Sequence, residues 1–473
     1  MSNLYIPDLS TDEFGEFIVG VAANFDRIGR SINSLSMASG EQRLGAHWDK
    51  EPSPILTRTH NADGLVANIG VDGEWVRNDF DSLPIFGELG ESVDELGNVF
   101  IRIPKFYIRK SSGLGFKTPE VRKNKQPGFY LPWCFWDFEK GVELPYIDYG
   151  KYKGSLLNGK LASVPDTHPL ISTNIVQMRN YAKANNVGGL KGYQQLDIHA
   201  YDVLQTLMFV EFATLNMQSV MPGFTSGAYS AAHTAALSES GTNQIIVTDA
   251  VASSFRVGQS IGIGSGAGSN SVTGSQHRVI TDITDAGGDN SAIVFDGSPV
   301  NISEGDVISN RGWTNGFSRN IASSSGCIGA NDGKYPCSYR GLESPYGDIW
   351  QFVDGINIDE HQVWVCNDAE QYASNFFASP YVPLNYINRN ENGYVKQMGF
   401  DPSAPFAEFP IEVGGAASTY YSDYYYQTTG QRIALVGGGW NNGLAAGPSY
   451  WNLSDSSSNA HVGIGGRLLK KPL

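Results

Sequence analysis

The feature that most constrains the fold is a change of composition in the middle of the chain. Between about residues 226 and 310 aromatic side chains almost disappear, and Gly, Ser, Thr, Ile and Val dominate, whereas Trp313 begins a return to an aromatic-rich composition. Short apolar runs separated by Gly, Asn and Asp turns are typical of strands. Four such runs lie at residues 245–247, 260–263, 278–283 and 292–295. The sequence therefore predicts an all-β module, residues 227–310, inserted in an exposed loop of a larger domain.

Within this module, residues 285–296 contain several acidic side chains and glycines. Carboxylates suit Ca²⁺, but the segment lacks the spacing of a helix–loop–helix calcium site. A plain loop is the favoured interpretation, and no metal or cofactor is expected anywhere in the chain.

The N-terminal residues, 1–40, contain an apolar heptad repeat. Its two sets of core positions, spaced seven apart, are Phe14, Val21, Ile28 and Leu35, and Ile18, Phe25 and Ile32. Such a seam predicts a coiled-coil helix, capped by Thr11 and ended near residues 39–40. Isoleucine at core positions favours a trimer. The alternative is a single amphipathic helix that packs on its own domain.

Residues 41–115 contain short strands and turns, and are interpreted as a small β-rich connecting region. Residues 196–214 form the best globular helix of the chain, with Asp197 as its cap. His199 is interpreted as a first-turn residue of this helix rather than as a ligand.

Composition excludes several classes of function. The formal net charge is -15, and such a surface repels phosphate backbones, so no nucleic-acid partner is expected. No run approaches the ~20 apolar residues that cross a bilayer, and no membrane insertion is expected. The acidic first residues do not resemble a signal peptide, which predicts synthesis in the cytoplasm.

The cysteines give no metal motif. Cys134, Cys327, Cys337 and Cys366 form neither a CxxC pair nor a zinc spacing. A disulfide between Cys327 and Cys337 remains an alternative, but reduced, partly buried thiols are favoured in a protein made in the cytoplasm.

Three C-terminal motifs resemble a known scaffold. The run SPYGDIWQFV at residues 344–353, the GGGW motif at residues 437–440 and the GIGGR motif at residues 463–467 resemble the C-type lectin fold of the formylglycine-generating-enzyme type. The resemblance implies an α+β class with a discontinuous C-type-lectin-like domain, residues 116–226 and 311–473. It also implies that 437–440 and 463–467 are fixed parts of the scaffold.

The block WNNGLAAGPSYWN at residues 440–452 resembles the variable region of proteins diversified by retroelements, the class that includes the phage major tropism determinant. Residues 41–226, especially the runs WDK at 48–50, TRT at 57–59 and FIRIPK at 100–105, are similar to phage tail and tail-tip proteins of Gram-positive hosts. These resemblances imply a ligand-binding surface between residues 441 and 461, rich in adaptable polar groups and rigid aromatics, with Tyr450 and Trp451 as anchors. The alternative is an ordinary polar hairpin with two core aromatics. The expected ligand-binding residues are Asn441, Asn442, Leu444, Ala445, Ser449, Tyr450, Trp451, Ser454, Asp455, Ser457, Ser458, Asn459 and His461.

An enzymatic role is not expected. The oxidase branch of the resembled fold uses a C-terminal cysteine pair, and residues 437–473 contain no cysteine. Paired carboxylates would serve a glycan hydrolase, and Asp348, Asp354 and Glu343 are candidates, but Asp348 is better interpreted as ordering the loop before Trp350.

These expectations combine into a phage tail-tip receptor-binding protein of the virion. It would be a homotrimer attached to other tail or baseplate proteins, and it would bind a host cell-surface protein or wall glycan. The alternatives are a structural tail component without receptor contact and a tail-associated glycan hydrolase.

Overall fold

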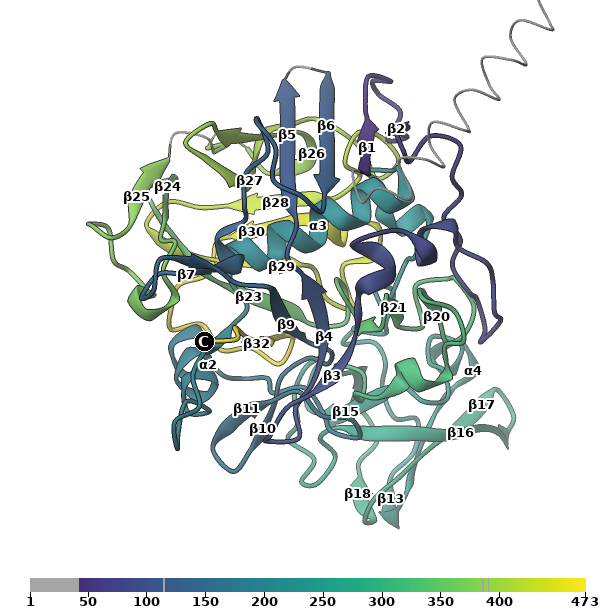
Figure 1. The fold of residues 1–473 in the computed structure, drawn as a ribbon. Coiled ribbons are helices and arrows are strands. Elements are labelled where there is room, and N and C mark those ends of the chain that lie inside the picture. The colour runs from purple at the N-terminus through teal and green to yellow at the C-terminus, as the bar shows by residue number, and fades with distance from the viewer. Residues whose placement is uncertain (1–41, 114, 385–386, 390) are drawn as a thin grey trace, which may run out of the picture.

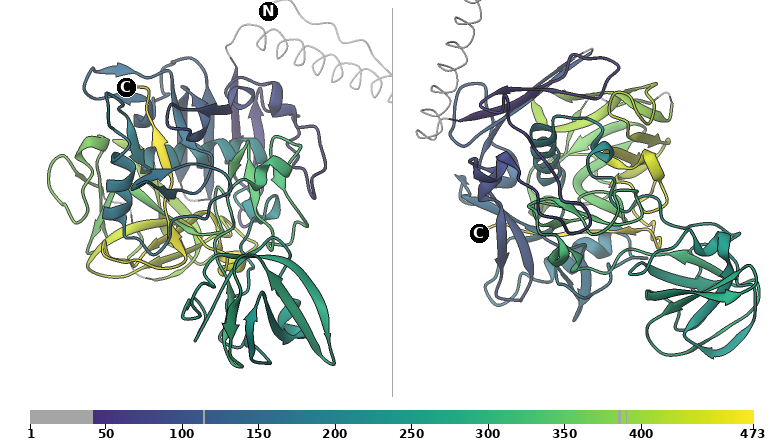
Figure 2. Two further views of the ribbon diagram at one scale, coloured as in Figure 1. Left: turned by 90° about the horizontal axis from the view of Figure 1, so that it is seen from below. Right: turned by 90° about the vertical axis from the view of Figure 1, so that its right-hand side faces the viewer.

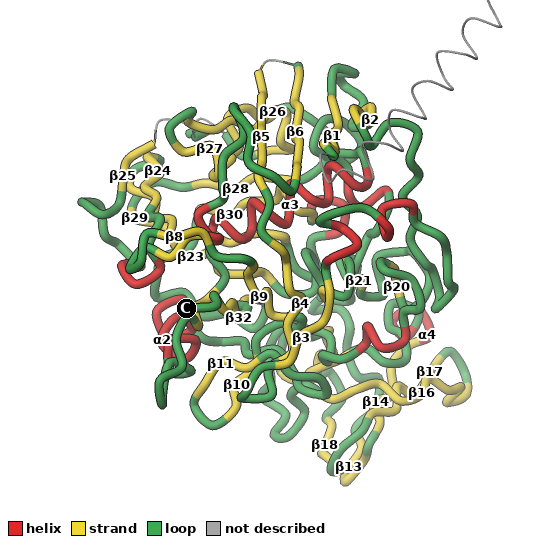
Figure 3. Tube along the Cα trace, viewed as in Figure 1, coloured by secondary structure: helices red, strands yellow, loops and turns green. Residues whose placement is uncertain are grey.

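The computed structural model describes residues 42–473 except residues 114, 385–386 and 390 (Figure 1). Strands and loops dominate these residues, and helices are few (Figure 3). The fold is mostly β, with several antiparallel sheets and a near-closed barrel. The expected α+β class is confirmed in part: helices and antiparallel sheets are both present, but strands far outnumber helical segments. The predicted coiled-coil helix of residues 1–40 lies outside the described residues, and among those described no helix is long and apolar enough to cross a membrane.

The largest sheet contains nine strands, and it carries the C-terminal segment. Eight strands follow the order β25-β24-β23-β29-β30-β28-β26-β27, and β31 pairs with β23 in parallel. The strands are β23 (Trp350–Asp359), β24 (Gln362–Val365), β25 (Val382–Leu384), β26 (Gly393–Asp401), β27 (Ala404–Val413), β28 (Tyr424–Gln427), β29 (Gln431–Gly437), β30 (Gly447–Leu453) and β31 (Ile464–Gly465). Strand β30 is therefore interior, between β29 and β28.

Helix α3 (Ile198–Phe212) is buried along its whole length in the centre of the molecule (Figure 1). The side chain of Asp197 caps it by accepting a 2.8 Å hydrogen bond from the amide of Ala200, and Ala213 ends it in a left-handed conformation. A helix that is buried on every side is a core helix, and its polar side chains, such as that of Glu211, have partners inside the protein. The predicted helix and cap are confirmed, and His199 lies in the first turn as expected.

Strands from the region 41–115 pair with later strands instead of forming a body of their own. The sheet β2-β1-β6-β5 contains β1 (Arg43–His47), β2 (Thr57–His60), β5 (Tyr107–Gly113) and β6 (Phe116–Arg122). The boundary at residue 115 falls inside the β5–β6 hairpin, and Leu44, Ile108 and Val121 share one hydrophobic cluster with α3 and the largest sheet. Part of the predicted connecting region, residues 41–115, therefore shares a hydrophobic core with later parts of the chain.

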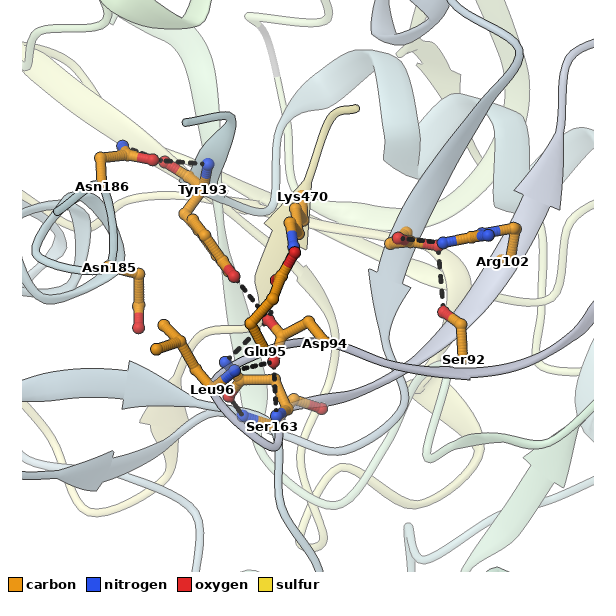
Figure 4. Close-up of polar contacts among 12 residues, drawn as sticks. Ser92, Asp94, Glu95, Leu96, Arg102, Ser163, Asn185, Asn186, Tyr193 and Lys470 are labelled. Carbon is orange, nitrogen blue, oxygen red and sulfur yellow. Dashed lines mark hydrogen bonds and ion pairs between the residues drawn. The ribbon is translucent and has the colours of Figure 1, made fainter. Parts of the chain in front are cut away.

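A five-stranded sheet places the last strand of the chain in its interior, in the order β12-β32-β9-β4-β3. It contains β3 (Gly90–Val93), β4 (Val99–Pro104), β9 (Tyr146–Gly150), β12 (Tyr193–Gln195) and β32 (Leu468–Lys470). Asp94 accepts hydrogen bonds from the Tyr193 hydroxyl at 2.7 Å and from the Asn98 amide at 2.8 Å, and Lys470 pairs with Glu95 at 2.7 Å (Figure 4). These contacts attach the β3–β4 turn to β12 and β32.

Smaller elements complete the body. Helix α2 (Ile175–Lys183) is capped by Asn174, and its Arg179 binds both carboxylate oxygens of Asp354 in β23, at 2.6 and 2.8 Å. The short sheets are β7 (Trp136–Asp137) with β8 (Val142–Glu143), β10 (Ser155–Leu157) with β11 (Lys160–Ala162), and β20 (Gly326–Cys327) with β21 (Cys337–Tyr339) and β22 (Leu342–Glu343).

The four cysteines are free thiols and all are buried, as the sequence predicted for reduced side chains. Cys327 and Cys337 lie opposite one another on β20 and β21. Burial raises the pKa of the Cys327 thiol to about 12, so this pair is unreactive at neutral pH.

Residues 228–308 have a hydrophobic cluster of their own, and the segment projects from one side of the body (Figure 2). Its sheets contain β13 (Glu239–Thr242), β14 (Gln244–Thr248), β15 (Ser260–Gly264), β16 (Arg278–Gly287), β17 (Asn290–Phe295), β18 (Val300–Ile302) and β19 (Val307–Asn310), with the short helix α4 (Asp249–Ala252). Most of residues 285–296, expected as a plain loop, belongs instead to the β16–β17 hairpin. At the junction with the body, His168 and His277 stack at 4.6 Å between ring centroids.

Candidate functional site

The glycine motif of residues 437–439 lies at a sharp change of direction after β29. Gly437 and Gly438 have φ values of 89° and 77°, which favour glycine. A Cβ atom on Gly438 would lie 2.7 Å from Cβ of Ala446 and 3.0 Å from the Tyr450 ring. Trp440 is 2% exposed and packs in an apolar cluster with Trp313 and Ile349. This part of the segment is a rigid frame, as expected.

Arg467 forms the second half of the frame. It is fully buried, and its guanidinium donates to the carbonyl oxygens of Gly150, Lys151, Glu343 and Ser344 at 2.7–3.1 Å. Nε also donates to Oε1 of Gln351 at 2.9 Å. Burial lowers the pKa of Arg467 to about 10, and the five contacts compensate the loss of water. The side chain fixes the last strands and is inaccessible to a ligand.

The expected anchors of the ligand are core residues, which corrects that prediction. Ser449, Tyr450 and Trp451 are exposed by 0%, 2% and 0%. The Trp451 ring packs edge-to-face against Phe409 at 5.8 Å and Tyr201 at 6.2 Å. Neighbouring side chains of a strand point to opposite faces, and both faces of β30 are covered here. Because these three side chains have no free surface, they cannot supply the contact area of a binding site.

The loop after β30 is where the predicted polar residues reach solvent. Ser458 and His461 are exposed, and the remaining predicted residues of this loop are partly exposed: Ser454, Asp455, Ser457 and Asn459. Asp455 organises the loop, since it accepts hydrogen bonds from Asn452 at 3.0 Å and from Asn459. Burial raises the pKa of the Asp455 carboxyl.

A second exposed group lies on the short 3-10 helix η7 (Gly443–Ala445). Asn441 is exposed, Leu444 is 64% exposed, and Asn442 and Ala445 are partly exposed. The backbone of Gly443 is held on both sides: its amide donates to Thr225 O at 2.7 Å, and its carbonyl accepts from Gln218 at 2.9 Å. We define the C-terminal surface as the predicted residues of these two groups that reach solvent. They are Asn441, Asn442, Leu444, Ala445, Ser454, Asp455, Ser457, Ser458, Asn459 and His461.

A row of tyrosines next to β30 was missing from the predicted site. Tyr424 and Tyr394 are partly exposed and Tyr426 is 43% exposed. The centroid of the Tyr424 ring lies 5.1 Å from that of Tyr394, 5.0 Å from that of Tyr426 and 6.2 Å from that of Tyr450. We call the three of these residues that reach solvent, Tyr394, Tyr424 and Tyr426, the tyrosine strip. The sequence contains a signal for this strip. Tyr424 and Tyr426 are two residues apart, so in a strand they lie on the same face, and the buried Tyr425 lies on the opposite face.

The candidate carboxylates for hydrolysis are buried and have structural partners. Asp348 accepts a 2.7 Å hydrogen bond from the amide of Trp313, Asp354 pairs with Arg179, and Glu343 accepts from the amides of Gly316 and Ser318. Burial raises the pKa of Asp348 to about 6. Asp348 thus joins two loops, as expected. Among the described residues no group of three or more His, Cys, Asp or Glu side chains is placed to hold a metal ion.

Comparison of the sequence with protein-family models and with curated proteins found no match.

Proposed function

We propose that this chain is a non-enzymatic receptor-binding protein of a bacteriophage tail tip, with a C-type-lectin-like scaffold that presents the C-terminal surface and the tyrosine strip to a host ligand. The observation that carries the proposal is the contrast within residues 437–467. Buried residues hold both ends of the segment, and the residues between them include two exposed groups: one around Leu444, and one of mostly short polar side chains after β30.

The physical chemistry of the two exposed groups favours recognition. Short Ser and Asn side chains adapt their hydrogen bonds to a partner, and tyrosines supply contact area at a small cost in conformational entropy. The buried frame reduces the ordering that binding would require, which favours affinity. If the N-terminal residues trimerise the protein, three such surfaces would act together, and avidity would convert weak contacts into stable adsorption.

Adsorption to host cells tests this proposal. The triple variant Asn441→Asp, Leu444→Asp and Ser458→Asp changes exposed side chains and leaves the frame intact. The matched control is Leu237→Asp with Val257→Asp, two exposed residues of the segment 228–308 that are 53% and 52% exposed. We expect the purified triple variant to lose both its binding to host cells and its inhibition of phage adsorption, while the control retains both.

The same experiment distinguishes the alternatives. If the chain is a structural tail component, the triple variant binds cells as the parent does, or neither protein binds. In that case removal of the chain stops virion assembly. A glycan hydrolase predicts release of soluble sugar from host walls incubated with the purified protein. Either result would contradict the proposal.

A further inference from the structure

A second site is suggested by a cleft that shares no residue with the C-terminal surface. The cleft has a volume of about 600 Å³, within the range of pockets that hold small ligands. Three separate parts of the chain form its walls: the segment after β7, the loop between α2 and β12, and the 3-10 helix η6 (Ala369–Gln371). The end of the chain, next to β32, completes it. Figure 1 places β7, α2 and the C-terminus on the same side of the molecule.

One wall of the cleft is aromatic. Trp136 is partly exposed and Phe138 is 37% exposed, and both line the cleft. They are held by Trp133, whose ring centroid lies 6.0 Å from that of Trp136 and 5.4 Å from that of Phe138. Aromatic rings that remain exposed in a concave site supply an apolar surface for a ligand.

The wall also contains a buried ammonium group. Lys471 is 5% exposed, and its Nζ donates to the carbonyl oxygens of Trp133 and Trp136 at 3.4 Å each. It lies 5.8 Å from the centroid of the Phe138 ring, and among the described residues no carboxylate forms an ion pair with it. Two long hydrogen bonds compensate a buried charge poorly. A ligand oxygen acceptor would therefore be stabilised beside Lys471.

The lining also contains charged side chains, Asp137, Glu139, Asp368, Glu370 and Lys191. Asp137 pairs with Lys140 at 3.2 Å and is buried. Glu139 and Lys191 form a solvent-exposed pair at 3.4 Å, and Glu370, whose side chain is 68% exposed, pairs with Lys183 at 3.8 Å. Exposed carboxylates accept hydrogen bonds from hydroxyl groups, and the formal charge of -15 on the whole chain disfavours a polyanion.

We propose that this cleft binds an uncharged saccharide. A sugar ring has an apolar C–H face, which the rings of Trp136 and Phe138 would cover. Its hydroxyls both donate and accept hydrogen bonds, so they can donate to Glu139 and Glu370 and accept from Lys471. A charge-neutral ligand with many hydroxyls matches all three observations, whereas a polyphosphate matches only the lysines. This site goes beyond the proposed receptor function and does not depend on it.

Calorimetric titration of the full chain tests the inference. The probes are three uncharged tetrasaccharides, of α-linked glucose, β-linked glucose and N-acetylglucosamine, with heparin as the polyanionic probe. We expect at least one of the uncharged probes to bind with a Kd of about 1 mM or lower. Phe138→Ala and Trp136→Ala should weaken that binding about tenfold or more. The matched control is Trp75→Ala, because Trp75 is 70% exposed and lies outside the cleft.

The two cleft variants keep the test decisive. Trp136 belongs to β7, so its removal can disturb folding, whereas Phe138 follows the strand and is more exposed. Circular dichroism of each variant establishes which of them is folded. Three results would overturn the inference: no binding of any uncharged probe, equal binding by the parent and a folded cleft variant, or binding of heparin alone.

Discussion

Glu211 accepts two hydrogen bonds from the guanidinium of Arg340, at 2.7 Å from Nε and 2.6 Å from Nη2. The pair joins the last turn of α3 to the turn after β21, and both side chains are almost fully buried. The Tyr339 hydroxyl and the Asn78 amide donate to the same carboxylate, each at 2.8 Å. A pair with this many partners holds the helix in register with the sheets around it.

Removal of one partner of this pair should be costly. In Arg340→Met the carboxylate of Glu211 keeps its burial but loses the guanidinium that binds both of its oxygens, and we expect a loss of about 3–5 kcal/mol in the free energy of unfolding. Urea denaturation measures it. Adding Glu211→Gln should recover part of the loss, because the buried charge is then removed. If the double variant were less stable than Arg340→Met, the ion pair would not be the cause.

Trp451 gives a prediction that separates a core role from a binding role. Its ring packs between α3 and β27, so Trp451→Ala should lower the free energy of unfolding by about 3–5 kcal/mol. Leu444→Ala, at a 64% exposed position, should change it by less than about 0.5 kcal/mol. Thermal denaturation with and without urea measures the loss of stability in each of the two variants. A stable Trp451→Ala protein that fails to bind cells would restore Trp451 to the binding site.

The frame of the C-terminal surface can be tested with two glycines. Gly438 and Gly443 both have positive φ, 77° and 56°, but a Cβ on Gly438 would overlap Ala446, whereas Gly443 has open space around it. We expect Gly443→Ala to cost about 1–2 kcal/mol from backbone strain alone. Gly438→Ala should cost roughly 1–3 kcal/mol more, from overpacking. Equal losses in chemical denaturation would show that steric contact with Ala446 does not restrict this turn.

The sequence predicted those parts of the structure that local patterns decide. A capping Asp197 before a long apolar run indicates α3, and the loss of aromatic residues indicates the segment that has its own core at 228–308. The pairing of β1 with β6 was not predictable in this way, because strand pairing between distant segments leaves no local pattern.

The candidate site shows the same limit. Side chains alternate between the two faces of β30, so Tyr450 and Trp451 lie on opposite faces. If one face of this strand were open to solvent, one of the two rings would be exposed. The ring of Trp350, whose centroid lies 4.5 Å from that of Tyr450, covers the outer face. This residue is distant in the sequence, and nothing in the run around Tyr450 indicates its presence. The exposed polar loops, by contrast, follow from composition, since short Ser and Asn side chains favour turns.

The junction between the body and the segment 228–308 should respond to acid. Burial, the stacked His168 and the nearby Arg311 lower the pKa of His277 to about 3, and burial lowers that of His168. An unfolded histidine binds a proton near its ordinary pKa of 6.5. Between these two pH values the unfolded state therefore binds more protons than the folded state. The contribution of the neutral histidines to the free energy of unfolding is complete above pH 6.5 and is lost as the pH decreases towards 3.

Asparagine at position 277 provides the matched variant. His277 has a φ of 55°, which asparagine tolerates better than most residues, and asparagine does not titrate. We expect the melting temperature of His277→Asn to fall less than that of the parent between pH 7 and pH 4, because acid no longer favours protonation of that unfolded side chain. Carboxylates titrate equally in both proteins, so the difference between the two curves reports on His277. Parallel curves would mean that the junction histidine does not contribute to the acid response.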